Sequence, residues 1–162
     1  MRITGRMEMT VRDADGALLA RRQVGNQVLR DGALLVAQLF AGTAGVGPID
    51  FVQVGWNREA ADIESTALGA PPPPVPPAEA IAAAALRSPV RSEDFRLDAT
   101  RRDVVQVSVS TLFRPTVDLP EVSEAGLMAG NRLYNQVVFE PVTLRVGQDV
   151  TFFWEIDFPF GN

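Results

Sequence analysis

The sequence of 162 residues contains no cysteine and no histidine. These absences exclude disulfide bonds, thiol nucleophiles, zinc sites built from Cys and His, and any Ser-His-Asp or Cys-His catalytic arrangement. Lysine is absent as well, so all 15 cations are arginines. A high-GC genome explains this usage, and the functional alternative is that arginines lock subunits together through bidentate contacts with carboxylates.

Long apolar runs and an excess of positive charge are also missing. No stretch approaches about 18 uninterrupted apolar residues, and the N-terminal MRITGRMEMTVRDADG has no apolar core segment. We therefore expect neither insertion into a membrane nor a secretory signal peptide. The formal net charge of −5 argues against a nucleic-acid partner, because nucleic acids are bound largely by clustered cations.

The residues that are present suit a single folded domain over residues 1–162. Hydrophobic residues make up 46% of the chain and charged residues 22%, as in ordinary folded proteins. The strongest strand pattern is DVTFFWEIDFPF, residues 149–160, in which Glu155 and Asp157 fall on one face. The opposite face carries five large apolar side chains: Val150, Phe152, Trp154, Ile156 and Phe158.

Weaker alternating patterns predict further strands over residues 3–12, 18–24, 49–55, 89–97, 105–113 and 132–139. A turn at Asp13–Gly16 joins the first two. Between residues 28 and 40 the period changes to that of an amphipathic helix, with Asp31 as the predicted N-cap and Gly42 as the stop. The fold predicted from these segments is mainly β: an antiparallel sandwich or barrel of about seven strands, with one short helix packed on it.

A Pro/Ala-rich arm, APPPPVPPAEAIAAAAL, is inserted at about residues 70–86. Residues 71–77 contain six prolines and predict an extended polyproline II segment, and residues 78–86 predict two helical turns. Overlapping P-x-x-P spacings suit recognition by SH3-type domains, but the nearest cations, Arg58 and Arg87, are far along the chain. We therefore predict a stiff arm.

Apparent reactive groups in the sequence have simpler structural explanations. The Asp13–Gly16 segment resembles the start of a calcium loop, but Val24 occupies the place of the bidentate glutamate. Residues 42–47 are glycine-rich, yet they follow a helix and lack a Walker pattern. Paired carboxylates, the requirement of a glycosidase, are expected on solvated surface: Glu155 with Asp157, Glu93 with Asp94, and Glu121 with Glu124. We predict no catalytic residue, no metal and no cofactor.

Candidate contacts with other molecules are Trp56, Arg58, Pro71, Pro74, Pro77 and Phe160. The arm is already extended, so it can lie across a neighbouring subunit at little entropic cost. Trp56 and the terminal Phe158-Pro159-Phe160 are the best candidates for exposed apolar contacts, but for them we expect burial in their own domain.

Several segments follow one another in a distinctive order. A helix with a small-residue stop at 32–42 precedes a strand ending in VG at 54–55, and Asp62 and STAL at 65–68 follow. EAGL, VVFEP, VGQDV and WEI come later, at 124–127, 137–141, 146–150 and 154–156. Over about residues 26–158 this order resembles a family of small bacteriophage structural proteins of the tail-fibre, collar or decoration type. The chain departs from that family at Trp56-Asn57-Arg58, where the family has Gly-Thr-Gly, and in the proline-rich insertion.

The resemblance implies a non-enzymatic structural component of a phage or phage-tail-like particle, associated with the tail, collar or baseplate and forming a symmetric homo-oligomer. Its partners would be itself and other particle proteins, and its location the virion after assembly in the bacterial cytoplasm. The alternatives are a capsid decoration protein, or a module of the particle that binds a carbohydrate or receptor on the host surface.

The EAGL segment also has a structural explanation in its residues alone. Gly126 is expected to take a positive φ between two strands, and Leu127 is expected to enter the core. Glu124 can accept hydrogen bonds from nearby backbone N–H groups. We therefore predict a structural role for this segment.

Overall fold

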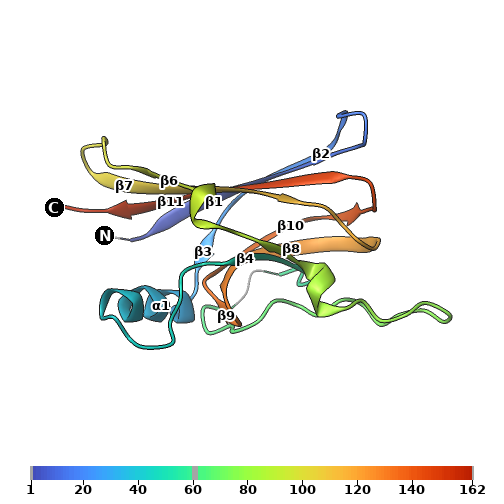
Figure 1. The fold of residues 1–162 in the computed structure, drawn as a ribbon, viewed down its shortest axis with the longest axis horizontal. Helices are drawn as coiled ribbons and strands as arrows, with labels where there is room; N and C mark the ends of the chain where they lie inside the picture. The colour runs from blue at the N-terminus through green and yellow to red at the C-terminus, as the bar shows by residue number, and fades with distance from the viewer. Residues whose placement is uncertain (1, 60–61, 162) are drawn as a thin grey trace.

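The computed structural model describes residues 2–59 and 62–161 and contains two antiparallel β-sheets packed face to face (Figure 1). The first sheet has the order β2-β1-β11-β7-β6, with β1 (Thr4–Arg12), β2 (Leu18–Gly25), β6 (Phe95–Asp98), β7 (Val104–Phe113) and β11 (Asp149–Pro159). The second has the order β3-β10-β8-β4-β5, with β3 (Gln27–Val28), β4 (Phe51–Gly55), β5 (Arg87–Pro89), β8 (Leu119–Ala129) and β10 (Asn135–Leu144). A short strand, β9 (Arg132–Leu133), pairs with β8. The predicted mainly β, antiparallel sandwich is confirmed, although the described residues form eleven strands in place of seven.

Strand β11 lies at the centre of the first sheet, between β1 and β7. Its side chains Val150, Phe152 and Trp154 are fully buried, and the rings of Phe152 and Trp154 stack with their centroids 5.7 Å apart. Met7 and Met9 of the neighbouring β1 are buried in the same core. The predicted alternation is therefore confirmed. Each such side chain contributes about 1.5–3 kcal/mol when it leaves water, so β11 is a main source of stability.

The hairpin between β1 and β2 turns at Asp13–Gly16, as predicted. Asp13 Oδ1 accepts hydrogen bonds from the backbone N–H groups of Asp15 and Ala17, each at 2.9 Å. Gly16 has a φ of 85°, in the left-handed region that favours glycine. The Asp13 carboxylate therefore shapes the turn.

Helix α1 (Arg30–Phe40) confirms the predicted helix and lies at one end of the molecule (Figure 1). Its N-cap is Leu29, so the prediction of Asp31 as the cap is wrong. Asp31 lies in the first turn, and its carboxylate binds Arg132 of β9 at 2.7 Å. Gly42, with a φ of 66°, follows the end of the helix as predicted.

The position of α1 depends on a close backbone contact. A Cβ atom at Gly32 would lie 2.0 Å from the carbonyl oxygen of Tyr134, so only glycine allows this approach. Leu35 is buried in the main core, whereas Leu39, one turn later, is 41% exposed. The helix thus buries one narrow stripe that includes Gly32 and Leu35, and it leaves Leu39 and Phe40 at its C-terminal end exposed.

Two predicted elements differ in the structure. Residues 78–86 do not form two helical turns, because only Ala83–Leu86 form a 3-10 helix, η1. Helix propensity alone does not sustain so short a helix when its surface buries little. The strand predicted over residues 89–97 is divided between β5 in the second sheet and β6 in the first, with the 3-10 helix η2 (Ser92–Asp94) between them. This segment therefore crosses from one sheet to the other.

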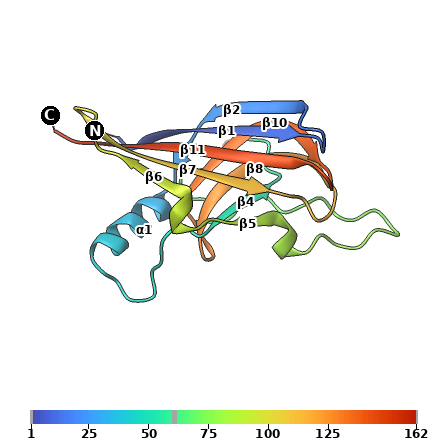
Figure 2. The same ribbon diagram turned by 45° about the horizontal axis from the view of Figure 1, so that its top comes forward.

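The Pro/Ala-rich segment projects from the sandwich as a narrow arm at the end opposite α1 (Figures 1 and 2). It leaves the domain at Ala70 and turns back where the Ala78 N–H donates to the Val75 carbonyl oxygen at 2.9 Å. Every side chain from residue 72 to residue 80 is exposed. The arm is therefore a segment that runs out and folds back on itself, rather than a single extended rod.

Candidate functional site

The base of the arm is organised by a buried carboxylate. Glu124 of β8 has no exposed surface, and it points to the outer face of the second sheet. Its Oε1 accepts hydrogen bonds from the backbone N–H groups of Asn57, at 3.4 Å, and Gly69, at 2.7 Å. Its Oε2 accepts the side-chain amides of Asn57, at 2.9 Å, and of Gln136. Charge-assisted hydrogen bonds of this kind are the strong ones, so Glu124 ties together both stems of the loop that leads into the arm.

The loop stems cover Glu124 from solvent. The backbone N–H of Trp56 donates to the Gly69 carbonyl oxygen at 3.2 Å, and the hydroxyl of Ser123 donates to the Asn57 carbonyl oxygen at 2.7 Å. A Cβ atom at Gly55 would lie 2.3 Å from Glu124 Oε1, so glycine is needed at the end of β4. The polar groups of the base are thereby satisfied within the chain, as burial requires.

A second, small apolar cluster completes the cover of this sheet. Leu68, from the end of the loop, packs with Met128 of β8, Leu133 of β9 and Leu29 before α1. Leu68 lies one residue before Gly69, so its burial holds the loop stem against Glu124. The outer face of β8 is therefore covered by the chain itself.

The EAGL prediction is right for two residues and wrong for the third. Leu127 is fully buried in the main core, and Glu124 accepts backbone N–H groups as expected. Gly126 does not take a positive φ between two strands, because it lies inside β8. A Cβ atom there would lie 2.5 Å from the carbonyl oxygen of Asn135, so close packing is the reason for glycine.

Two of the predicted contact residues lie beside this base. Trp56 is half-buried against the core, and its indole N–H donates to the Pro120 carbonyl oxygen at 2.6 Å. Arg58 is exposed and pairs with Glu121 at 3.4 Å. Trp56 therefore holds the start of the loop.

The other predicted contact residues are spread along the molecule. Pro71 is half-buried where the arm leaves the domain, and Pro74 and Pro77 are exposed on the arm. Phe160 is 49% exposed and follows β11 at the opposite end, where its N–H donates to the Asp103 carbonyl oxygen at 3.0 Å. The structure thus places Trp56 and Arg58 beside the base of the arm, Pro74 and Pro77 on its exposed part, and Phe160 at the other end of the domain.

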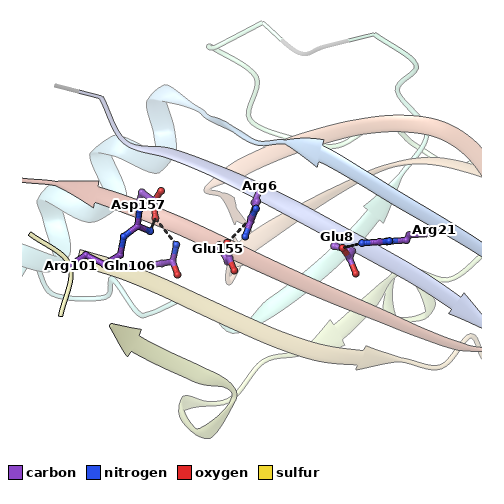
Figure 3. Close-up of polar contacts among 7 residues, drawn as sticks. All are labelled: Arg6, Glu8, Arg21, Arg101, Gln106, Glu155 and Asp157. Carbon is purple, nitrogen blue, oxygen red and sulfur yellow. Dashed lines mark hydrogen bonds and ion pairs between the residues drawn. The ribbon is translucent and has the colours of Figure 1, made fainter. Parts of the chain in front are cut away.

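The outer face of the first sheet carries charged side chains in pairs (Figure 3). Arg6 binds Glu155 at 2.5 Å, and Arg21 binds Glu8 at 2.7 Å. The hydrogen bond that Arg6 donates to the Glu155 carboxylate raises the pKa of the Arg6 guanidinium above its usual value. These pairs lie across strands β11, β1 and β2. The arginine side chains are 62% and 56% exposed, whereas those of Glu155 and Glu8 are 17% and 32% exposed, so solvent reaches each pair from the arginine side.

Asp157 completes this face (Figure 3). It accepts a hydrogen bond from the Gln106 side chain at 2.8 Å and lies 3.9 Å from a guanidinium nitrogen of Arg101. Glu155 and Asp157 line one hollow of the sheet surface, together with Arg6, Arg101 and Gln106. Both carboxylates are held by cationic or amide groups in a position open to water.

In the remaining predicted carboxylate pairs, Glu93 with Asp94 and Glu121 with Glu124, the two members have different surroundings and partners. Asp94 accepts the backbone N–H of Arg91 at 2.8 Å and caps η2, while Glu93 accepts the neighbouring Ser92 hydroxyl at 3.3 Å. Glu121 is exposed as predicted, but the prediction of a solvated position is wrong for Glu124, which is fully buried because side-chain and backbone donors replace water around its carboxylate. Among the described residues, no group of three or more acidic side chains has the geometry to hold a metal ion.

Comparison with known proteins does not assign the chain to a family. No family model, no curated protein and no solved structure matches it. Within residues 2–59 and 62–161, no helix is long and apolar enough to cross a membrane.

Proposed function

We propose that this chain is a non-enzymatic structural component of a bacteriophage or phage-tail-like particle, associated with the tail, collar or baseplate and assembling as a symmetric homo-oligomer. The observation that carries the proposal is the exposed arm at residues 72–80, which projects from a compact sandwich and is anchored at its base by a buried carboxylate. Exposed apolar surface of this kind typically marks a contact with another protein, and a projecting arm suits a subunit that reaches a neighbour.

The order of segments from residue 26 to residue 158 supports the same function through its resemblance to small phage structural proteins. In this chain the matching residues have roles in packing and anchoring. Leu127 fills the core, Gly126 allows a close backbone contact, and Glu124 fixes the loop before the arm. Each of these roles builds a rigid shape, which is what a particle subunit contributes.

The carbohydrate- or receptor-binding alternative has less support from the contacts of its proposed residues. The indole N–H of Trp56 already donates to the Pro120 carbonyl oxygen, and the Arg58 guanidinium already donates to the Glu121 carboxylate. A sugar site usually presents a free aromatic face with polar groups converging beside it. A glycan array tests this alternative, and binding that is lost in Arg58→Ala would favour it over the structural role.

Electron microscopy of particles from the producing strain tests the proposal. A tagged chain should co-purify with intact particles, and gold labelling of the tag should mark the tail, collar or baseplate in negative stain. Labelling spread over the capsid would favour a decoration protein instead. A chain that is absent from every particle fraction contradicts the proposal.

A further inference from the structure

Helix α1 leaves an apolar face without cover. Phe40 is 95% exposed and Leu34 50%, and Ala33 and Ala37 beside them are exposed too. Residues 33, 37 and 40 share one side of the helix, because steps of three and four residues return to the same face. The sequence contains no charged residue from position 32 to position 49. An exposed aromatic ring on such a surface is typical of a contact site.

The proline arm is a second apolar surface with little charge. Glu79 is the single charged residue between positions 70 and 82 of the sequence, and Val75 near the tip is 77% exposed. Proline fixes the backbone φ, so the arm has little conformational freedom to lose on binding. Proline-rich segments typically dock on surfaces that carry aromatic side chains. The chain itself exposes such a surface at Phe40.

The two surfaces lie at opposite ends of the molecule in both views (Figures 1 and 2). The arm of one chain is therefore unable to cover its own helix, but it can reach α1 of a second copy placed end to end. Such a contact joins two different patches. It produces a ring when the rotation between copies closes, and a filament when it does not.

We propose that the arm of one copy, residues 70–82, binds the apolar face of α1 centred on Phe40 in the next copy. The chemistry of the two surfaces favours a second copy as the occupant, because proline-rich segments dock on aromatic side chains such as Phe40. The α1 face carries charge only at its N-terminal end, where Arg30 pairs with Glu64, and the arm carries charge only at Glu79, so two copies of net charge −5 can meet there without placing like charges in contact. The proposal rests on the proposed function, since it names the contact through which subunits assemble. A contact between one narrow arm and one helix face is small, and interfaces of under about 1,200 Å² are weak, so a closed ring would gain strength from its several simultaneous contacts.

The lack of cysteine permits a site-specific test. Full-length Ala37→Cys and Val75→Cys variants, one with a mass tag, are mixed and treated with a short bismaleimide. We expect a mixed cross-linked species in the mixture and none with either variant alone. Leu97→Cys, a 75% exposed position on β6 outside both surfaces, is the matched control. A mixture that gives no more product than this control overturns the proposal, and so does cross-linking of either variant alone.

A further substitution tests the role of the aromatic ring. Phe40→Asp in the Ala37→Cys chain should reduce the cross-linked product at least about tenfold, as for a central contact residue. Its unfolding midpoint in urea should stay unchanged, because the Phe40 side chain is almost fully exposed. Undiminished cross-linking overturns the proposal.

Particle fractions separate this inference from the proposed function. In particles that contain the chain, the Ala37→Cys/Val75→Cys double variant should give a ladder of cross-linked species. A chain present in particles without that ladder contradicts the arm contact alone. A chain absent from all particle fractions contradicts the proposed function, whatever the cross-linking in solution shows.

Discussion

Strands β8 and β11 both lie at the centre of a sheet, yet their sequences differ in character. β11 carries large apolar side chains that alternate with polar ones, whereas β8 contains the small and polar run SEAG at residues 123–126. Along β11 buried and half-buried positions alternate, while β8 is buried without a break from Val122 to Ala129. The outer face of β11 meets solvent, and the outer face of β8 is covered by the loop that ends in Leu68.

The two glutamates on these outer faces show what the cover changes. Glu155 of β11 is partly buried, but its partner Arg6 is 62% exposed, so water screens the interaction. Glu124 of β8 is fully buried and needs a partner for each oxygen, because an unsatisfied buried carboxylate is very costly. The same residue type therefore belongs to a solvated surface in one sheet and to the anchor of a loop in the other. Burial decides the role.

The largest expected effect is on the apolar face of β11. Trp154→Ala should lower the free energy of unfolding by about 3–5 kcal/mol, because it opens a cavity beside Phe152 in a close-packed core. Urea unfolding followed by circular dichroism measures this loss. Phe153→Ala, on the other face of the same strand, is the control and should cost much less. Equal losses at the two positions would show that β11 does not have one dominant buried face.

A smaller effect is expected at Tyr134, which joins β9 to β10 beside β8. Burial raises the pKa of the Tyr134 phenol from 10.0 to about 12. The folded state therefore keeps this proton while the unfolded state loses it, so stability is complete below pH 10 and falls as the pH rises towards 12. A shift of this size corresponds to about 2–3 kcal/mol.

The chain is well suited to this measurement, because it has one tyrosine and neither lysine nor cysteine. Tyr134→Phe should flatten the fall in stability between pH 10 and pH 12, and the ultraviolet absorbance of the phenolate should report the raised pKa directly in the wild type. At neutral pH the variant should be at least as stable, since the hydroxyl has no hydrogen-bond partner among the described residues. A wild-type phenol that titrates at its ordinary pKa would contradict the burial of Tyr134.

Next in size is the effect of removing the buried carboxylate. Glu124→Ala should lower the free energy of unfolding by about 1–3 kcal/mol, because four donors lose their acceptor. The loss should be local first: hydrogen exchange at the Asn57 and Gly69 amides should accelerate while the amides of β11 stay protected. Glu121→Ala, an exposed position on the same strand, is the matched control. Unchanged exchange at Asn57 and Gly69 would remove Glu124 from its anchoring role.

The comparison also shows which parts of the fold a sequence can predict. Four strands were predictable from the sequence: β1, β2, β7 and β11. Each has one face in the core and one towards solvent, so apolar and polar residues alternate along it. β8 has no such period, since both of its faces are buried. The crossing of the chain from the second sheet at β5 to the first sheet at β6 could not be predicted either, because a change of sheet does not alter the alternation of apolar and polar residues.

The base of the arm was less predictable than the arm itself. Prolines mark the arm directly, but Glu124 finds its partners 67, 55 and 12 residues away, at Asn57, Gly69 and Gln136. Such distant pairings have no local pattern. The one available signal was an acidic residue within a strand-length run of small and apolar residues, which indicates a buried and therefore satisfied carboxylate.

The smallest effect is expected at the counterpart of Glu124 on the exposed sheet. Glu155→Gln should shift the urea midpoint only slightly, because its partner Arg6 is 62% exposed and ion pairs that solvent reaches contribute at most about 1 kcal/mol. Glu124→Gln, the same chemical change in the covered sheet, should shift the midpoint clearly, since an amide places donors against the donors of Asn57 and Gly69. Measuring both at low and high salt separates screening from burial. If the two substitutions gave equal shifts, the cover over β8 would not be what distinguishes the sheets.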